Sequence, residues 1–343
     1  MLELRAVRHR YEEGGGGGRT GRVVLDLDAF AVPPGALIGI VGHNGSGKST
    51  LLRLLALLER PSEGEVHFEG KPVTPRNARA LRRRVTLVEQ RPVLFRGTVR
   101  ENLGYGLRLR GIRRTEVNRI LETAAERLGV QGLLSRERHE LSDGEVQRVA
   151  VARALAIAPD VLLLDEPVSS ADRAAAAALY RVLDEERRAR GLAVCLASHQ
   201  LEDAYRWADD IRTIAEGKLS PVTPENLFRV ELPTGAPAGS TTKHARVGEI
   251  DITVATDREG PAILAVPPTD IFVSRQPLAS SARNVFSGHV TRLTHARAGT
   301  VHVTADVGVE LVAVVTEEAV RELGLVPGSP VTFAFKANAV RIF

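Results

Sequence analysis

The chain has 343 residues, of which 43% are hydrophobic and 26% charged, and its formal net charge is +4. This composition excludes general disorder, and the length predicts two or three domains. The balance of 46 basic and 42 acidic residues gives no argument for a nucleic-acid partner. The single cysteine, Cys195, excludes an internal disulfide and a cysteine-based zinc cluster. Because we find no secretory signal and no apolar run near ~18 residues, we expect a cytoplasmic chain that does not itself cross a membrane.

Strand-length apolar runs alternate with helical stretches through the first two thirds of the chain. The runs are Leu37–Val41, Val85–Val88, Val161–Leu164 and Ala193–Ala197, and the helical stretches are Lys48–Leu58, Glu116–Leu128, Gly144–Ala156 and Arg173–Arg188. This alternation predicts a parallel or mixed sheet covered by helices, an α/β fold. The glycine run Gly14–Gly18 predicts a flexible loop between two early strands.

The pattern changes after a segment rich in proline, glycine and small polar residues, Glu231–Thr242, which we interpret as a linker. Seven short alternating runs follow, with one helical stretch at Glu317–Leu323; the runs are Glu249–Val254, Ile263–Val266, Asp270–Val273, Gly288–Leu293, Thr300–Val307, Leu311–Val315 and Val331–Lys336. They predict a small all-β barrel. We therefore expect an α/β domain over residues 1–230 and a β domain over residues 231–343.

The most specific motif is Gly42-His-Asn-Gly-Ser-Gly-Lys-Ser49, which lies between an apolar run and a leucine-rich helical stretch. This is the GxxxxGK[ST] phosphate loop in its strand–loop–helix context. Its glycines let the backbone wrap around phosphates, so that successive N–H groups and the helix N-terminus point at negative charge. We expect Lys48 to reach the β- and γ-phosphates and the Ser49 hydroxyl to bind Mg²⁺.

An apolar run that ends in two acids, Val161–Leu164 followed by Asp165 and Glu166, supplies the second half of such a site. Asp165 is expected to hold Mg²⁺ through water. Glu166 is expected to polarise the water that attacks the γ-phosphate.

Two more motifs follow the same order as in a known family. Leu141-Ser-Asp-Gly-Glu145 precedes a helical stretch that carries Gln147 and Arg148, and Ser198-His199 ends the last apolar run. With the phosphate loop and the acid pair, these motifs resemble those of the ATP-binding cassette ATPases of membrane transporters, over about Met1–Phe228. The resemblance implies a P-loop cassette with a mixed sheet and a helical lobe.

The resemblance also implies roles for single residues. Tyr11 would stack on adenine, Gln90 would touch Mg²⁺ and sense the membrane partner, and His199 would hold the γ-phosphate and the attacking water. Ser142, Gly144 and Asp172 would face the ATP and the interface of a second copy of the chain. The expected nucleotide-binding set is Tyr11, Gly42, Asn44, Gly45, Ser46, Gly47, Lys48, Ser49, Thr50, Ser142, Gly144 and Asp172. The expected catalytic residues are Glu166, His199, Lys48 and Gln90, and the expected metal ligands are Ser49, Gln90 and Asp165.

The signature departs from the commonest family form, LSGGQ, at two positions. Asp143 replaces a glycine and Glu145 replaces a glutamine, while the serine and the second glycine are kept. The residues for the phosphate contacts are therefore still present. Asp143 adds a negative charge near the partner's nucleotide, which we expect to weaken ATP binding or slow the closure of the dimer.

Two regions indicate what the ATP energy moves. The stretch that begins at Gln90 resembles import cassettes for tungstate and related oxyanions, and its apolar Val93, Leu94 and Phe95 suit a docking surface for the membrane subunit. Ser280-Ser-Ala-Arg-Asn284, with Phe335-Lys-Ala337, resembles the small barrel that carries molybdate or tungstate, over about residues 280–343.

A tetrahedral dianion needs several N–H and O–H donors in a pocket without carboxylates. Ser281, Arg283, Asn284 and Lys336 are donors of this kind. Just upstream, Pro267 and Thr269 stand where related barrels carry an arginine and a glutamate.

The sequence thus predicts an ATP-hydrolysing importer subunit, with ATP and Mg²⁺ as cofactors and tungstate favoured over molybdate as cargo. The resemblance implies a homodimer on the cytoplasmic face of the membrane, bound to transmembrane permease subunits and indirectly to a solute-binding protein. Three alternatives stay open at this point: an importer of sulfate, a sugar or a polyamine; a soluble cassette ATPase acting on nucleic acid or ribosomes; and an oxyanion sensor with a degenerate ATPase.

Overall fold

The computed structural model describes residues 1–11, 21–167, 173–198, 207–220, 226–234, 242–277, 280–295 and 299–343. For residues 173–175 and 220 it describes the backbone only. The predicted loop Gly14–Gly18 and the site residues Asp172 and His199 lie outside these residues, as does much of the expected linker. The chain divides into two compact units, Met1–Pro221 and Val222–Phe343. Within the described residues no helix is both long enough and apolar enough to span a membrane.

The first unit is built on a six-stranded sheet in the order β10-β9-β3-β8-β7-β6. Its strands are β3 (Leu37–Val41), β6 (Val85–Val88), β7 (Val161–Asp165), β8 (Ala193–Ala197), β9 (Asp210–Ala215) and β10 (Lys218–Ser220). All are parallel except the edge strand β10. Every residue of β3, β7 and β8 is buried, as expected for parallel strands covered on both faces.

A second, antiparallel sheet of order β2-β1-β4-β5 covers one face of the first. It contains β1 (Leu2–Tyr11), β2 (Arg22–Val32), β4 (Glu63–Phe68) and β5 (Lys71–Pro72). Helix α1 (Lys48–Leu55) shares one apolar core with both sheets. Cys195 is fully buried in this core, where it acts as a small apolar side chain.

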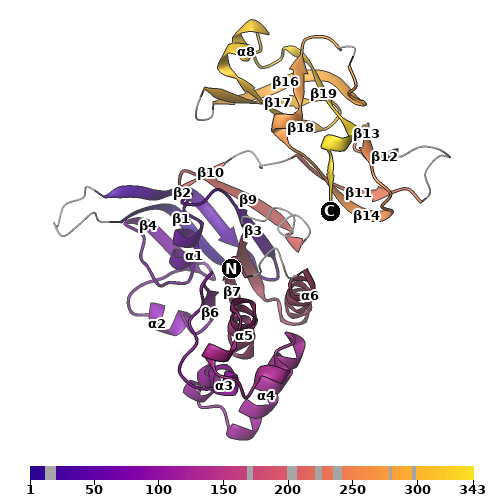
Figure 1. Ribbon diagram of the computed structural model, residues 1–343. Coiled ribbons are helices and arrows are strands. Elements are labelled where there is room, and N and C mark those ends of the chain that lie inside the picture. Colours follow the sequence, from indigo (N-terminus) through magenta and orange to yellow (C-terminus); the bar gives the residue numbers. More distant parts are fainter. Residues whose placement is uncertain are drawn as a thin grey trace. The chain divides into compact units, whose positions relative to one another are not determined.

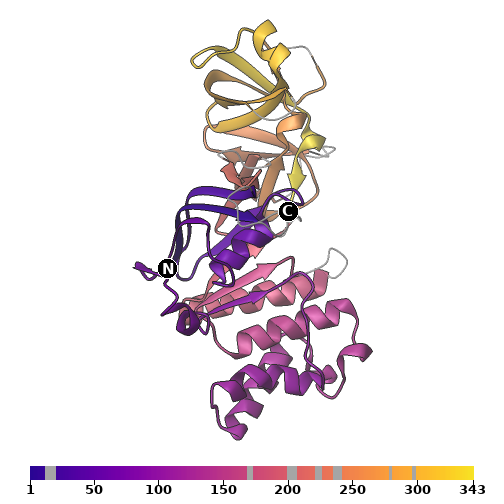
Figure 2. The same cartoon turned by 90° about the vertical axis from the view of Figure 1, so that its left-hand side faces the viewer.

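Helices α5 (Asp143–Ala156) and α6 (Arg173–Arg190) cover the other face of the six-stranded sheet (Figures 1 and 2). Helices α3 (Val99–Leu109) and α4 (Arg114–Arg127) pack against α5 as a separate helical lobe, and the short α2 (Ala78–Leu81), η1 (Gln131–Leu133) and η2 (Arg138–Glu140) lie elsewhere in the unit. The predicted strands and helices of this unit are confirmed, and their ends differ by at most a few residues.

The second unit is all-β apart from short helical turns and packs around one apolar core. Its strands are β11 (Asn226–Leu232), β12 (Thr242–Val247), β13 (Ile250–Ala255), β14 (Gly260–Val266), β15 (Phe272–Ser274), β16 (Asn284–His295), β17 (Thr300–Asp306), β18 (Glu310–Thr316), β19 (Pro330–Phe335) and β20 (Arg341–Ile342). Its helical turns are η3 (Pro268–Asp270), η4 (Ala337–Ala339) and α8 (Glu317–Glu322). Strand β11, through which the expected boundary at 230/231 runs, pairs with β14 along its whole length.

The second unit consists of two similar halves, which sequence patterning did not reveal. In each half a long first strand pairs with a later strand: Asn226 lies opposite Val266, and Asn284 lies opposite Phe335. Each later strand leads through a helical turn, η3 or η4, into a short strand that pairs with the other half. Thus β15 pairs with β19, and β20 pairs with β14. The halves exchange their last strands, so neither is complete alone.

Two asparagines join the halves in the same way. Asn284 accepts a hydrogen bond from the Thr253 N–H at 2.7 Å and donates to the Thr253 carbonyl at 2.9 Å. Asn226 accepts from the Val312 N–H at 2.7 Å and donates to the Val312 carbonyl at 2.9 Å. Both asparagines are buried, so an unpaired amide at either place would cost the desolvation of a polar group. We call these two contacts the asparagine clamps.

Candidate functional site

The expected nucleotide residues lie at the carboxyl ends of neighbouring parallel strands. The phosphate loop follows β3, the acid pair ends β7, and Gln90 follows β6. In open α/β sheets this edge is where ligands bind. The sheet order β3-β8-β7-β6 places these strand ends side by side, and this is the local reason that residues distant in sequence gather at one site.

The phosphate loop is shaped by a glycine at the entry to α1. Gly47 has φ of +108°, and a Cβ there would lie 2.7 Å from the Leu25 side chain and 3.0 Å from the Val24 carbonyl oxygen. Only glycine fits both the backbone conformation and the packing against β2. The loop therefore delivers Lys48 as the first residue of the helix, with the helix N-terminus facing the loop.

Lys48 is buried, and its ammonium group lies at the mouth of the loop. Nζ donates to the Gly42 carbonyl at 2.6 Å and to the His43 carbonyl at 3.1 Å. Burial lowers the pKa of Lys48, and the nearby charges of Glu166 and Asp165 oppose this shift. The cation is thus oriented by backbone oxygens next to two carboxylates, a position in which it can pair with a phosphate.

Ser49 and Asp165 form the oxygen-rich part of the site. Burial raises the pKa of Asp165, and a hydrogen bond to the Ser49 side chain acts against that shift. One hydroxyl and one carboxylate are the protein ligands that Mg²⁺ uses when phosphates and water complete its octahedron. No group of three or more acidic, histidine or cysteine side chains suited to a metal occurs among the described residues.

Glu166 is held in an unusual backbone conformation beside Gln90. Its φ of +48° is left-handed, its N–H donates to the Ala197 carbonyl at 2.9 Å, and the Gln90 side-chain amide donates to its carboxylate. A non-glycine residue in this region stores backbone strain that the surrounding structure must balance. The strain and the amide contact fix the direction of the Glu166 carboxylate at the strand end.

Tyr11 lies at the end of β1 and is 41% exposed. Its hydroxyl donates to the Glu59 carboxylate at 2.9 Å and lies 3.4 Å from the Thr50 hydroxyl of α1. The imidazole of His9 meets the tyrosine ring edge-on at 5.0 Å between centroids. The ring is therefore anchored near the phosphate-loop helix while much of its surface stays accessible for stacking.

Ser142 is the N-cap of α5 and is bound by Glu145. The Ser142 N–H and hydroxyl donate to the same Glu145 oxygen at 2.8 and 2.9 Å, and the Glu145 N–H donates back to the hydroxyl at 3.3 Å. These contacts from the Ser142 backbone and side chain lower the pKa of Glu145, with Arg136 and Arg148 adding to the effect. This is a capping box, with serine at the N-cap and glutamate three residues later.

Asp143 and Gly144 complete the exposed face of the signature. The Asp143 side chain is fully exposed and forms an ion pair with Arg138 at 3.2 Å. A Cβ added to Gly144 would meet nothing within 4 Å, so the space next to it is open. The structure thus presents the signature at the surface, where a second molecule can reach it.

The apolar residues expected to form a docking surface divide into two groups. Val93 and Phe95 are 74% and 48% exposed, whereas Leu94 is 8% exposed and packs in the helical core. The Leu94 prediction is therefore wrong, because neighbouring residues in this loop point to opposite sides. Tyr105 and Leu109 are also exposed on α3, and the Tyr105 ring lies 4.5 Å from that of Phe95.

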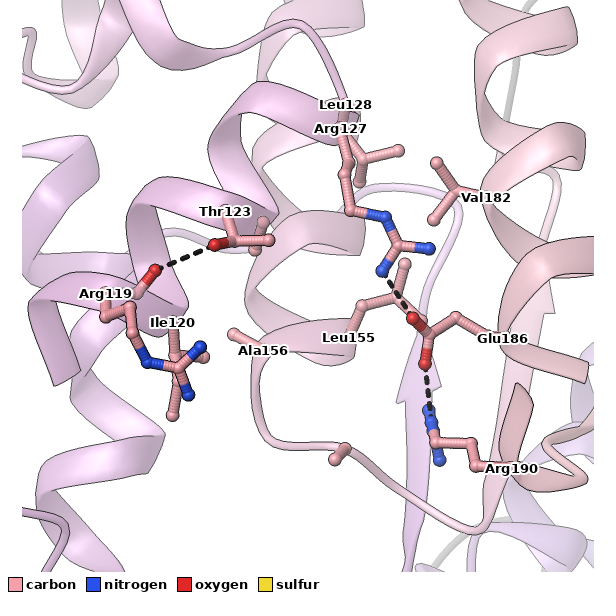
Figure 3. A pocket seen from close by; sticks show the side chains of 12 residues that line it. Arg119, Ile120, Thr123, Arg127, Leu128, Leu155, Ala156, Val182, Glu186 and Arg190 are labelled. Carbon is pink, nitrogen blue, oxygen red and sulfur yellow. Dashed lines mark hydrogen bonds and ion pairs between the residues drawn. The ribbon is translucent and has the colours of Figure 1, made fainter. Parts of the chain in front are cut away.

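A cavity of about 260 Å³ lies between α4, α5 and α6 (Figure 3). On one side Arg127 and Arg190 both point at Glu186, and on the other lie Arg119, Ile120 and Thr123 of α4 (Figure 3). Burial would raise the pKa of Glu186, but the hydrogen bonds from the two arginines outweigh it and lower the pKa. The cavity contains none of the predicted site residues. Its ion pairs join α4 to α6.

The candidate oxyanion residues lie at one end of the β16–β19 pair. Arg283 and Lys336 each lie one residue beyond the paired Asn284 and Phe335, on the same end of the two strands. Both cations and Ser281 are exposed, and among the described residues neither cation has a hydrogen bond or ion pair to a carboxylate. Asn284 differs from the other three, because its amide is buried in an asparagine clamp.

Two family models match the chain. A model described as ABC transporter matches residues 25–169, and one described as TOBE domain matches residues 280–342. The second match covers one half of the C-terminal unit. Its other half, which begins at Asn226, is recognised through the asparagine clamps and the exchanged strands.

The chain is similar to import ATPases along its whole length. It is 32% identical over 359 aligned residues to a molybdate/tungstate import ATP-binding protein of Pyrococcus horikoshii, covering 100% of both chains. It is 34% identical to a tungstate uptake system ATP-binding protein of Peptoclostridium acidaminophilum, covering 58% of this chain and 91% of the relative. A solved dimeric ATP-binding cassette bound to ADP and phosphate matches with a TM-score of 0.59 at 24% identity, covering 64% of this chain and 97% of that one, and it shows the fold.

The fold and the similarities define a P-loop cassette ATPase with a C-terminal TOBE domain. The chain belongs to the family of ABC transporter ATP-binding subunits, specifically those similar to molybdate/tungstate import proteins.

Proposed function

We propose that this chain is the ATP-hydrolysing subunit of an importer of a tetrahedral oxyanion, with tungstate preferred to molybdate. The observation that carries the proposal is the pairing of two anion sites in one chain. The phosphate loop with Lys48 lies at the carboxyl edge of the parallel sheet, and a pair of exposed cations, Arg283 and Lys336, lies at the end of β16 and β19.

In the nucleotide site each residue has one task. The phosphate loop and Lys48 bind the phosphates of ATP, and Tyr11 stacks on the base. Ser49 and Asp165, with Gln90, would hold Mg²⁺, which neutralises charge that develops on the transferred phosphoryl group. Glu166 orients and deprotonates the attacking water, and its carboxylate is already directed by Gln90.

The active unit is a homodimer in this proposal. Ser142 and Gly144 are exposed, so the γ-phosphate of ATP bound to a second copy can reach them. The roles given to His199 and Asp172, which lie outside the described residues, follow from the family resemblance. Closure around two ATP molecules would drive the membrane subunits to another state, and hydrolysis would reset them.

The exposed Val93 and Phe95, with Tyr105 beside them, are proposed as the docking surface for a transmembrane permease subunit. Such docking would hold the chain on the cytoplasmic face of the membrane, with the solute-binding protein engaged only through the permease. An apolar patch on an otherwise polar lobe is the usual mark of a binding surface.

A tetrahedral oxyanion suits the Arg283–Lys336 end because guanidinium and ammonium groups both pair with such ions, and no carboxylate of the described residues forms an ion pair with either cation. A second candidate is an importer of another solute. It is favoured by the 33% identity to an Fe(3+) ions import ATP-binding protein of Escherichia coli O157:H7, over 67% of this chain and 64% of that relative.

The test has two independent parts. First, ATP hydrolysis is measured for the wild type and for Glu166→Gln, which should bind ATP but lose turnover. Second, the full chain is titrated calorimetrically with tungstate, molybdate and sulfate. Tight binding of tungstate or molybdate, with sulfate much weaker, supports the cargo. If the chain hydrolyses ATP but binds sulfate as tightly as tungstate, or binds no oxyanion, the proposed ATPase function stands and the proposed oxyanion cargo is overturned.

A further inference from the structure

Glu59 lies where the chain turns back after α1, the helix that follows the phosphate loop. Just beyond the helix, Leu57 has a left-handed φ of +59°, and its side chain is buried in the core shared by the two sheets. The N–H groups of Leu58 and Glu59 both donate to the Arg53 carbonyl, at 3.0 and 3.4 Å. A left-handed residue that ends a helix in this way reverses the direction of the chain. The turn therefore carries Glu59 back beside the helix, where it meets the end of β1.

The two oxygens of the Glu59 carboxylate have different partners. Oε2 accepts a hydrogen bond from the Tyr11 hydroxyl at 2.9 Å, and Nε2 of His9 lies 3.3 Å from the same oxygen. Oε1 forms an ion pair with Arg53 at 3.6 Å, and Arg53 also pairs with Glu89 at 3.2 Å. Tyr11 thus meets an acceptor that other residues of the chain already hold in place.

The contact with Glu59 restrains a ring that is largely open to a ligand. Tyr11 is the last residue of β1 and is 41% exposed, and its ring meets His9 edge-on. The Thr50 hydroxyl lies farther from the tyrosine hydroxyl than Glu59 does, at 3.4 Å. A hydrogen bond to an ionised carboxylate is stronger than one to a neutral hydroxyl. The bond to Glu59 therefore fixes the direction of the ring, and ordering a free side chain on binding would otherwise cost affinity.

We propose that Glu59 is a positioning residue of the nucleotide site, which holds the Tyr11 ring in the orientation that receives the base before the nucleotide binds. This inference rests on the proposed stacking of Tyr11 on adenine and adds the residue that acts through it. The base lies away from the reacting phosphate and is bound alike before and during the reaction. Loss of Glu59 should therefore raise KM for ATP and leave kcat unchanged.

The experiment compares ADP with inorganic pyrophosphate, both with Mg²⁺, in calorimetric titrations of the full chain. Pyrophosphate tests the phosphate loop alone, because it has no base to stack. Glu59→Ala is expected to lower the affinity for ADP about fivefold, the scale of ordering one side chain on binding. The affinity for pyrophosphate should change less than about twofold. Glu59→Gln, which keeps an acceptor for the tyrosine hydroxyl, should restore the affinity for ADP.

Two further variants show whether Glu59 acts through the tyrosine. Tyr11→Phe removes only the hydroxyl and should lose as much affinity for ADP as Glu59→Ala. The double variant Tyr11→Phe/Glu59→Ala should lose no more than either single variant, because all three remove the same contact. The matched control is Glu116→Ala, which breaks a surface ion pair with Arg119 on α4 and should leave both affinities unchanged. In steady-state ATP hydrolysis, Glu59→Ala should raise KM about fivefold at constant kcat.

Several results would overturn the inference. Equal losses for ADP and pyrophosphate in Glu59→Ala would show that Glu59 supports the phosphate loop instead, and additive losses in the double variant would show that it acts apart from Tyr11. If Tyr11→Ala weakens ADP binding and Glu59→Ala does not, the positioning role falls and the stacking stands. If Tyr11→Ala leaves ADP binding unchanged, the proposed stacking falls as well. Thermal unfolding identifies any variant that fails to fold, and Tyr11→Phe tests the same contact with Glu59 intact.

Discussion

The two sets of cations that we propose to bind anions have contrasting surroundings. In the first unit Lys48 is buried, and two backbone carbonyls fix its ammonium group within a contiguous loop. In the second unit Arg283 and Lys336 are exposed at the ends of two strands that come from distant parts of the sequence. A buried, oriented cation acts strongly and is little screened, whereas exposed cations act more weakly and respond to salt.

The largest expected effect is at Lys48. Lys48→Ala removes the one cation fixed in the phosphate loop, and we expect kcat/KM for ATP to fall by about 10³-fold, in line with loss of a key electrostatic contact to a developing charge. Steady-state hydrolysis by the purified chain measures this. Lys71→Ala, on the exposed strand β5, is the control and should leave the rate unchanged. A fall of less than tenfold in kcat/KM for Lys48→Ala would contradict a strong, weakly screened contact between this buried cation and ATP.

The same contrast explains what sequence alone could predict. The phosphate loop and the acid pair are contiguous motifs whose spacing is imposed by the chemistry, so Lys48, Ser49 and Asp165 were predicted and the structure gathers them at one edge. The clamp between Asn226 and Val312 joins residues 86 positions apart, and no local pattern reports such a contact.

Asn284 shows a limit of prediction from residue type alone. As a sequence letter it reads as one more anion donor, but its amide is buried against Thr253. The repeated Asn-[Leu/Val]-Phe at residues 226–228 and 284–286 was the available signal for a duplicated unit. It is too short to be read without the strand pairing that gives it meaning.

The next largest effect is expected at Arg283. Arg283→Ala should weaken tungstate binding by about tenfold or more, since hydrogen bonds to charged groups contribute about 1.5–3 kcal/mol. Because the site is exposed, raising the salt concentration from 0.05 to 0.5 M should weaken wild-type tungstate binding more steeply than ATP binding. Titrations in a salt series measure both. If the affinities for tungstate and for ATP fell equally steeply with salt, the proposed difference between an exposed and a buried anion site would be contradicted.

The asparagine clamps provide a test of the duplicated unit itself. Asn226→Ala removes the amide partner of the backbone groups of half-buried Val312, and Asn284→Ala that of buried Thr253. Each should lower the free energy of unfolding of the C-terminal unit by about 1–3 kcal/mol. Denaturant unfolding of the full chain, followed by a probe in the second unit, measures the loss. The equivalence of the halves requires similar values for the two variants, and a large loss in only one of them would break it.

The smallest expected effect concerns the signature, where Glu145 accepts the hydroxyl proton of Ser142. A carboxylate can only accept, so while it is ionised it competes with a phosphate for that proton. Its lowered pKa keeps it ionised at neutral pH. Glu145→Gln keeps the capping geometry but removes the charge, and we expect ATP-driven dimerisation and kcat/KM to rise by about fivefold, the scale of a single screened charge contact.

The exposed Asp143 gives the matched control for that variant. Asp143→Asn also removes one negative charge from the signature, but the Asp143 side chain is paired with Arg138 and, within the described part of the chain, makes no hydrogen bond to Ser142. If the charge alone matters, both variants should gain equally in kcat/KM. If the bond to Ser142 matters, Glu145→Gln gains more. Sedimentation with ATP in a hydrolysis-deficient Glu166→Gln background separates dimer affinity from turnover, so a gain that appears only in turnover would contradict competition for the serine proton.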